Sequence, residues 1–129
     1  MPTTSPLILV VENDKIWRGN LVKMLEDMGY KVTTADSGFT AQERLLNTKN
    51  IDVVISSILL PDLTGPDLLI WERKNFRSRP RHRVFVFISG ITNTKESQKA
   101  KELGAEIFLT RPIDADFLKQ AMDKVSSKL

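Results

Sequence analysis

Blocks of apolar and polar positions alternate along the chain and predict five strand–helix units. Residues 7–11, 52–57 and 84–88 are largely apolar throughout, which is typical of strands covered on both faces. Residues 30–35 and 107–110 are shorter strand candidates. Strands that alternate strictly with helices favour an α/β fold, a doubly wound parallel sheet with helices on both faces.

The segments between these strands predict the helices. We expect helices after residues 14 and 37, over 67–73 and 94–103, and after residue 114. Asp14, Ser37 and Asp114 are side chains of the kind that cap helix N-termini, and Gly29 and Gly104 favour helix ends. The residues expected to face inward on the second and last helices are Phe39, Ala41, Leu45, Leu46, Phe117, Leu118, Ala121 and Val125.

The composition fits one globular domain. The 129 residues are 41% hydrophobic and 27% charged, and they include no cysteine, which excludes disulfides and thiolate metal sites. We expect a disordered lead at 1–6, a domain at 7–125 and a short tail at 126–129. With no apolar run of membrane-spanning length and no secretion signal, a cytoplasmic location is the expectation.

Polar residues follow four of the expected strands. In sheets of this kind, ligands bind at the carboxyl ends of the strands. Those ends carry Glu12-Asn13, Ser57, Ser89-Gly90 and Thr110-Arg111-Pro112. The third strand leads into the loop Leu60-Pro61-Asp62-Leu63-Thr64-Gly65, and Gly104-Ala105 and Phe108 lie near the fifth.

These motifs, in this order, resemble the receiver domain of bacterial response regulators in two-component (phosphorelay) signalling. The resemblance covers about residues 7–125. It implies a flavodoxin-like, CheY-type fold with five parallel strands in the order 2-1-3-4-5. It also implies a cis peptide bond between Arg111 and Pro112.

The resemblance assigns a role to each strand-end position, and several positions depart from the pattern. Ser57 stands where the family has its phosphate-accepting aspartate. Asn13 replaces one carboxylate of the acidic pair, and Arg111 replaces the lysine. Ser89 and Phe108 match the pair that repositions on phosphorylation.

The departures remove groups that the family's chemistry needs. A carboxylate must attack phosphorus, and Mg²⁺ prefers hard oxygen ligands, mainly carboxylates. Glu12 and Arg111 are the charges left at the strand ends, with Asp14 a further carboxylate if it turns inward. We therefore expect Mg²⁺ binding to be weak or absent, and an Arg111–Glu12 ion pair to close the former metal pocket.

Two alternatives stay open for the chemistry. Asp62 or Ser57 could act as a non-standard phosphate acceptor in a working receiver. The single histidine, His82, precedes the fourth strand at the opposite edge of the sheet, so it offers no base to Ser57. A flavodoxin-like ligand binder is a second alternative, but residues 12–18 are not a Ser/Thr/Gly-rich phosphate loop.

The chain carries a net charge of +3, and its basic residues are concentrated in one segment. Residues 73–83 hold six lysines and arginines and no acid. This segment is either a solvated connector or a docking patch for an acidic partner. Phe76 is its one aromatic residue, so nucleic acid is an unlikely partner. The candidate patch residues are Arg77, Arg79, Arg81 and Arg83.

The sequence predicts a receiver-family protein that is not an enzyme. Our main hypothesis is a phosphorylation-independent pseudo-receiver that acts by protein–protein contact. The expected contact surface is formed by the fourth helix, fifth strand and fifth helix, about residues 94–125. A histidine kinase or an output protein is the expected kind of partner, and homodimerisation is left open.

Overall fold

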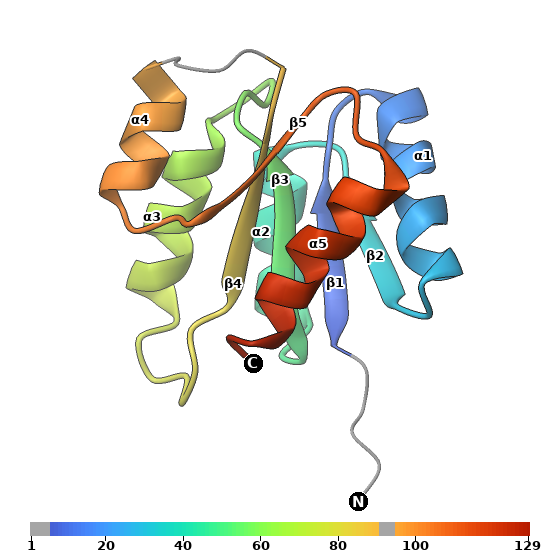
Figure 1. The fold of residues 1–129 in the computed structure, drawn as a ribbon. Coiled ribbons are helices and arrows are strands. Elements are labelled where there is room, and N and C mark those ends of the chain that lie inside the picture. The colour runs from blue at the N-terminus through green and yellow to red at the C-terminus, as the bar shows by residue number, and fades with distance from the viewer. Residues whose placement is uncertain (1–5, 91–94) are drawn as a thin grey trace, which may run out of the picture.

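The computed structural model describes residues 6–90 and 95–129, and it contains one five-stranded parallel sheet (Figure 1). The strand order is β2-β1-β3-β4-β5, so the predicted order is confirmed. The strands are β1 (Leu7–Val11), β2 (Lys31–Ala35), β3 (Ile51–Ser57), β4 (Val84–Ser89) and β5 (Ile107–Thr110). The helices are α1 (Lys15–Asp27), α2 (Gly38–Asn47), α3 (Gly65–Asn75), α4 (Lys95–Glu102) and α5 (Ala115–Ser126).

The helices cover both faces of the sheet. Figure 1 shows α1 and α5 on one face and α2, α3 and α4 on the other. Burial on both faces explains why the sequence of β1 is apolar without interruption. Ile8 and Val10 belong to the core under α1 and α5, whereas Leu9 and Val11 belong to the core on the opposite face. A strand buried on both faces has no position left for a polar side chain.

Helix boundaries follow from capping side chains. Asp14, Ser37 and Asp114 cap α1, α2 and α5 as predicted, each accepting hydrogen bonds from backbone amides in the first turn. Thr64 caps α3 in the same way. The expected start of the fourth helix at Thr94 and residues 1–5 of the expected lead at 1–6 lie outside the described residues.

Three aromatic or aliphatic side chains expected to face inward are exposed instead. Phe39 is 65% exposed, Leu46 59% and Phe117 62%. Each residue turns a helix by about 100°, so burial of Ala41 and Leu45 on α2 directs Leu46 and Phe39 away from the sheet. Phe117 is likewise one position before the buried stripe of α5, which consists of Leu118, Ala121, Met122 and Val125.

Gly65 lies where α3 begins, against the strands that form the site edge. A Cβ at this position would lie 2.7 Å from Phe87 Cε1 and 2.8 Å from the Ser57 carbonyl oxygen. We expect Gly65→Ala to lower the free energy of unfolding by about 1–3 kcal/mol, because the backbone of β3 must shift. Gly19→Ala is the matched control: no atom lies within 4 Å, and we expect a gain of about 0.5–1 kcal/mol. Urea denaturation measures both, and equal stability of the two variants would contradict the close approach.

Candidate functional site

Three side chains from three strand ends form a closed cluster at the carboxyl edge of the sheet. Glu12 follows β1, Ser57 ends β3 and Arg111 follows β5. Ser57 Oγ donates to Glu12 Oε1 at 2.6 Å, and Arg111 Nη2 donates to Ser57 Oγ at 2.8 Å. Arg111 Nη2 also forms an ion pair with Glu12 Oε1, so the expected Arg111–Glu12 pair is present. The Arg111–Pro112 bond is cis, as predicted.

Glu12 is buried, with 5% of its surface exposed, and the surrounding groups occupy both of its carboxylate oxygens. Oε1 is held by Ser57 and Arg111, and Oε2 accepts from the Asp14 backbone amide at 2.9 Å. A buried carboxylate is costly without such partners, so this network satisfies the negative charge of Glu12.

Arg18 is a second cation at this edge, and the sequence analysis missed it. Its Nη1 donates to the carbonyl oxygens of Glu12, at 2.8 Å, and Asn13, at 3.2 Å. Arg18 lies four residues after the α1 cap Asp14, and helical side chains lean toward the helix N-terminus. The four-residue spacing from Asp14 therefore could have predicted that the Arg18 side chain returns to the end of β1.

The side chains of the other two residues of the expected acidic cluster, Asn13 and Asp14, do not contact the Glu12 carboxylate. Asn13 Nδ2 donates to the Asp36 carbonyl oxygen at 3.3 Å. Asp14 Oδ1 accepts from the amides of Ile16 and Trp17, both at 2.9 Å. Asp14 is therefore occupied as a helix cap and does not add a carboxylate to the cluster.

Arg111 is held between the cluster and an aromatic ring. Its guanidinium carbon lies 5.4 Å from the centroid of Trp17, which is 38% exposed. Burial lowers the pKa of the Arg111 guanidinium below its ordinary value. Arginine remains charged at any physiological pH, so the Glu12 carboxylate keeps its partner.

This donor set does not fit a magnesium ion. Among the residues that the structure describes, no group of three or more His, Cys, Asp or Glu side chains is arranged to hold a metal. Glu12 is the single carboxylate in the cluster, and Mg²⁺ is usually bound through one or two carboxylates with free oxygens and several waters. A guanidinium bound to Glu12 Oε1 competes directly with any cation there.

Ser89 and Phe108, the switch-like pair, lie on neighbouring strands. Ser89 is buried at the end of β4, and its carbonyl oxygen accepts from the Arg111 amide at 3.1 Å. Phe108 is half-buried on β5, and its ring centroid lies 6.2 Å from that of Phe87. Whether the pair moves between two states stays a prediction.

Asp62 is exposed, but it is not free. Its two carboxylate oxygens accept from the backbone amides of Gly38 and Phe39, each at 2.8 Å, at the start of α2. Burial acts to raise the pKa of Asp62, but these backbone hydrogen bonds outweigh it and hold the pKa below its ordinary value of 3.8. The carboxylate thus bridges the β3–α3 loop to the start of the preceding helix, α2.

Asp62→Ala is expected to lower the free energy of unfolding by about 1 kcal/mol at neutral pH, the usual cost of losing a helix cap. Because the folded-state pKa is the lower one, this contribution is present above the ordinary pKa of 3.8 and lost as pH falls through the folded value. Denaturation of the wild type and of Asp62→Ala, from neutral pH down to the folded-state pKa of Asp62, measures the difference in their free energies of unfolding. A difference that grew with acidification would contradict the assigned hydrogen bonds.

The basic segment is divided between buried and exposed side chains, which corrects the expected patch. Arg83 is only 1% exposed, so it cannot belong to a docking surface. It donates to Glu72 Oε2 at 2.9 Å and to the Ile51 carbonyl oxygen at 2.7 Å. Arg79 is tied to the Lys49 carbonyl oxygen and to Asp52. Burial lowers the pKa of Arg83, and its hydrogen bond to Glu72 opposes that effect.

Comparisons with known proteins agree with this architecture. The response regulator receiver domain family matches residues 8–123. The rice two-component response regulator ORR3 is 28% identical over 99% of this chain and 96% of its own length. The 3',5'-cyclic-nucleotide phosphodiesterase regA of Dictyostelium discoideum is 32% identical over 92% of this chain, but that match covers only 15% of regA.

Solved structures of receiver proteins have the same fold as this chain. The receiver domain of an HD domain-containing protein from Pseudomonas fluorescens Pf-5 has a TM-score of 0.84 at 26% identity, covering 96% of both chains. The chemotaxis response regulator CheY4 of Vibrio cholerae has a TM-score of 0.82 at 25% identity, covering 95% of this chain and 99% of its own.

The sheet order and strand-end site define a CheY-like receiver fold. The chain belongs to the response regulator receiver domain family of two-component systems. Receiver domains interact with proteins such as kinases and output domains. No helix within residues 6–90 and 95–129 is long and apolar enough to cross a membrane.

Proposed function

We propose that this protein is a pseudo-receiver, a non-enzymatic domain that signals by protein–protein contact without being phosphorylated. The observation that carries this proposal is the Glu12–Ser57–Arg111 cluster. A hydroxyl occupies the acceptor position, and the one carboxylate beside it is engaged by a guanidinium.

Electrostatics supports the same proposal. The family pattern of three carboxylates and one lysine carries about −2 and attracts Mg²⁺, whereas here Glu12 and Arg111 cancel. Arg18 adds a second cation beside the Glu12 carbonyl. Phosphoryl transfer depends on neutralising oxygen charge with a metal, so a site that repels the metal disfavours the reaction.

The alternative, a working receiver with a non-standard acceptor, finds less support. Ser57 Oγ is buried and hydrogen-bonded to a carboxylate that is itself paired with Arg111. Asp62 is a carboxylate, but both of its oxygens are directed to the α2 amides. His82 precedes β4, at the opposite edge of the sheet.

The proposed contact surface is the α4–β5–α5 face, with a kinase or output protein as partner. Its outer side chains are mostly charged or polar, and Phe117 and Leu103 are its exposed large apolar residues among those described. Such a composition suits a transient contact, because obligate interfaces are more hydrophobic.

A magnesium titration tests the proposal. We expect isothermal titration calorimetry to show no saturable binding up to millimolar MgCl₂. Saturable binding that is lost in Glu12→Gln would contradict the pseudo-receiver, since it would place a metal where Arg111 now lies.

A further inference from the structure

A groove between α3 and the segment that joins α4 to β5 opens onto the amino edge of the sheet, far from the strand-end cluster. It consists of two adjoining pockets that share Leu69, Arg73 and Leu103. The first pocket has a volume of about 290 Å³, at the small end of the range for ligand sites. This volume suits one or two side chains of a partner better than a whole cofactor.

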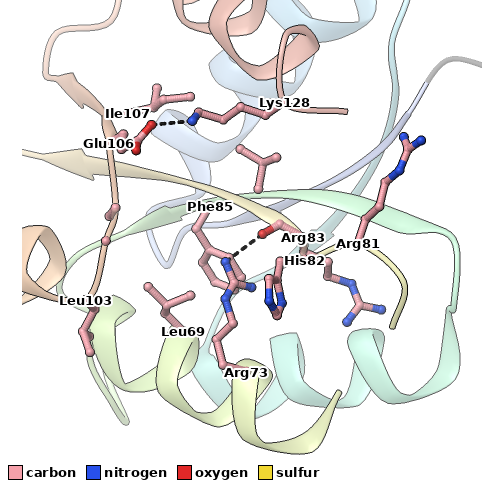
Figure 2. A pocket seen from close by; sticks show the side chains of 13 residues that line it. Leu69, Arg73, Arg81, His82, Arg83, Phe85, Leu103, Glu106, Ile107 and Lys128 are labelled. Atoms are coloured by element: carbon pink, nitrogen blue, oxygen red, sulfur yellow. Dashed lines mark hydrogen bonds and ion pairs between the residues drawn. The ribbon is translucent and has the colours of Figure 1, made fainter. Parts of the chain in front are cut away.

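The groove has an apolar floor. Ile70 and Leu103 are 41% and 42% exposed along its sides, although both are large aliphatic residues. Leu69 and Phe85 are buried, and the Arg73 guanidinium lies over the Phe85 ring (Figure 2). Exposed aliphatic side chains beside a depression are typical of surfaces that dock a partner.

The rim of the groove is basic. Glu106 is the one acidic residue among the described residues that line either pocket, and it is paired with Lys128. Arg73 donates to Glu72 and to the Arg83 carbonyl oxygen, so part of its charge is compensated. Arg83 is buried and paired with Glu72. The other lining cations are exposed and have no acidic partner in the described structure: Lys74, Arg77 and Arg81.

We propose that this groove docks an acidic amphipathic segment of a partner protein, with aliphatic side chains on Leu69, Ile70 and Leu103 and carboxylates on the basic rim. The charge complementarity selects an acidic occupant, and the apolar floor selects a peptide over nucleic acid. The aromatic ring in the basic segment gives nucleic acid no stacking surface, because Phe76 is covered by Arg83 at 4.4 Å and packs on Trp71.

This surface is separate from the strand-end cluster, and it adjoins the α4–β5–α5 face at Leu103. Its occupant is therefore independent of whether Ser57 or Asp62 accepts phosphate. The docking proposal can fail without affecting the pseudo-receiver proposal, and the reverse also holds.

Selection of a random peptide library displayed on phage, using the whole protein as bait, tests the proposal. We expect enriched peptides to combine Asp or Glu with Leu, Ile or Phe. In fluorescence anisotropy, a labelled copy of the best peptide should bind Lys74→Glu/Arg77→Glu/Arg81→Glu at least about tenfold more weakly than wild type, with affinity falling as salt rises. Ile70→Ser/Leu103→Ser should weaken it similarly.

The matched control is Lys15→Glu/Lys31→Glu/Lys119→Glu, which makes the same charge change at exposed positions away from the groove. It should bind the peptide within about twofold of wild type if local charge rather than net charge decides. Enriched peptides without acidic bias, or equal weakening in both triple variants, would overturn the proposal. Tighter binding of a labelled DNA duplex than of the peptide, lost in the groove variant, would assign the surface to nucleic acid instead.

Discussion

Replacing Glu72 with alanine is expected to lower the free energy of unfolding by about 3–5 kcal/mol, the usual cost of leaving a buried charge unpaired. Glu72 is 1% exposed and accepts from Arg83 at 2.9 Å and from Arg73 at 2.6 Å. Without it, the Arg83 guanidinium would keep only the Ile51 carbonyl and the Phe76 ring. Arg83 Nη2 already has no hydrogen-bond partner in the described structure, so little is available to compensate.

Two further variants show whether the loss comes from the unpaired charge. Glu106→Ala removes one side of an exposed pair with Lys128 and should leave the stability close to that of wild type. Glu72→Leu/Arg83→Met removes both buried charges and should recover much of the lost stability. A double variant that is less stable than Glu72→Ala would contradict this explanation. Urea denaturation at neutral pH gives all three values.

Restoring the family's charges should change the strand-end site from inert to reactive. We expect Asn13→Asp/Ser57→Asp/Arg111→Lys to bind Mg²⁺ and to form an acyl phosphate with acetyl phosphate. The gain comes from a carboxylate acceptor at the end of β3, a second acidic ligand beside Glu12, and removal of the guanidinium that pairs with Glu12.

The variant should be less stable than wild type without metal, because the added carboxylates repel Glu12. Mg²⁺ should then stabilise it by about 2.7 kcal/mol at a concentration near 100 Kd, while leaving wild type unchanged. Asn13→Asp/Ser57→Asn/Arg111→Lys is the matched control, since it lacks the acceptor carboxylate and should gain no phosphoryl group. A triple variant that binds no Mg²⁺ would mean that features other than these three residues close the site.

The fold could be predicted from the sequence because each strand and helix carries its own local signal. Apolar runs identified buried strands such as β1, and side-chain caps such as Asp14 identified helix starts. The prediction was wrong for some hydrophobic residues, which are exposed although they were expected to face inward. Phe39 and Phe117 are exposed because burial depends on the angle around the helix, which neighbouring core residues fix, and not on hydrophobicity alone.

The candidate site was predicted in part. The Arg111–Glu12 pair followed from charge and position, and it is present. The contacts of Arg18 and Asp62 were missed, because each side chain reaches backbone groups whose positions depend on the folded loops. The burial of Arg83 was also missed, because its partner Glu72 looks like a surface residue of α3 in sequence.

The most direct test of the central claim is the intact mass of the wild-type protein after incubation with acetyl phosphate and MgCl₂. The pseudo-receiver proposal predicts an unchanged mass, because the acceptor position holds Ser57 and the neighbouring carboxylate is paired with Arg111. A stoichiometric gain of one phosphoryl group would contradict it. Lability of that adduct to hydroxylamine would then indicate a carboxylate acceptor such as Asp62, and resistance would indicate Ser57.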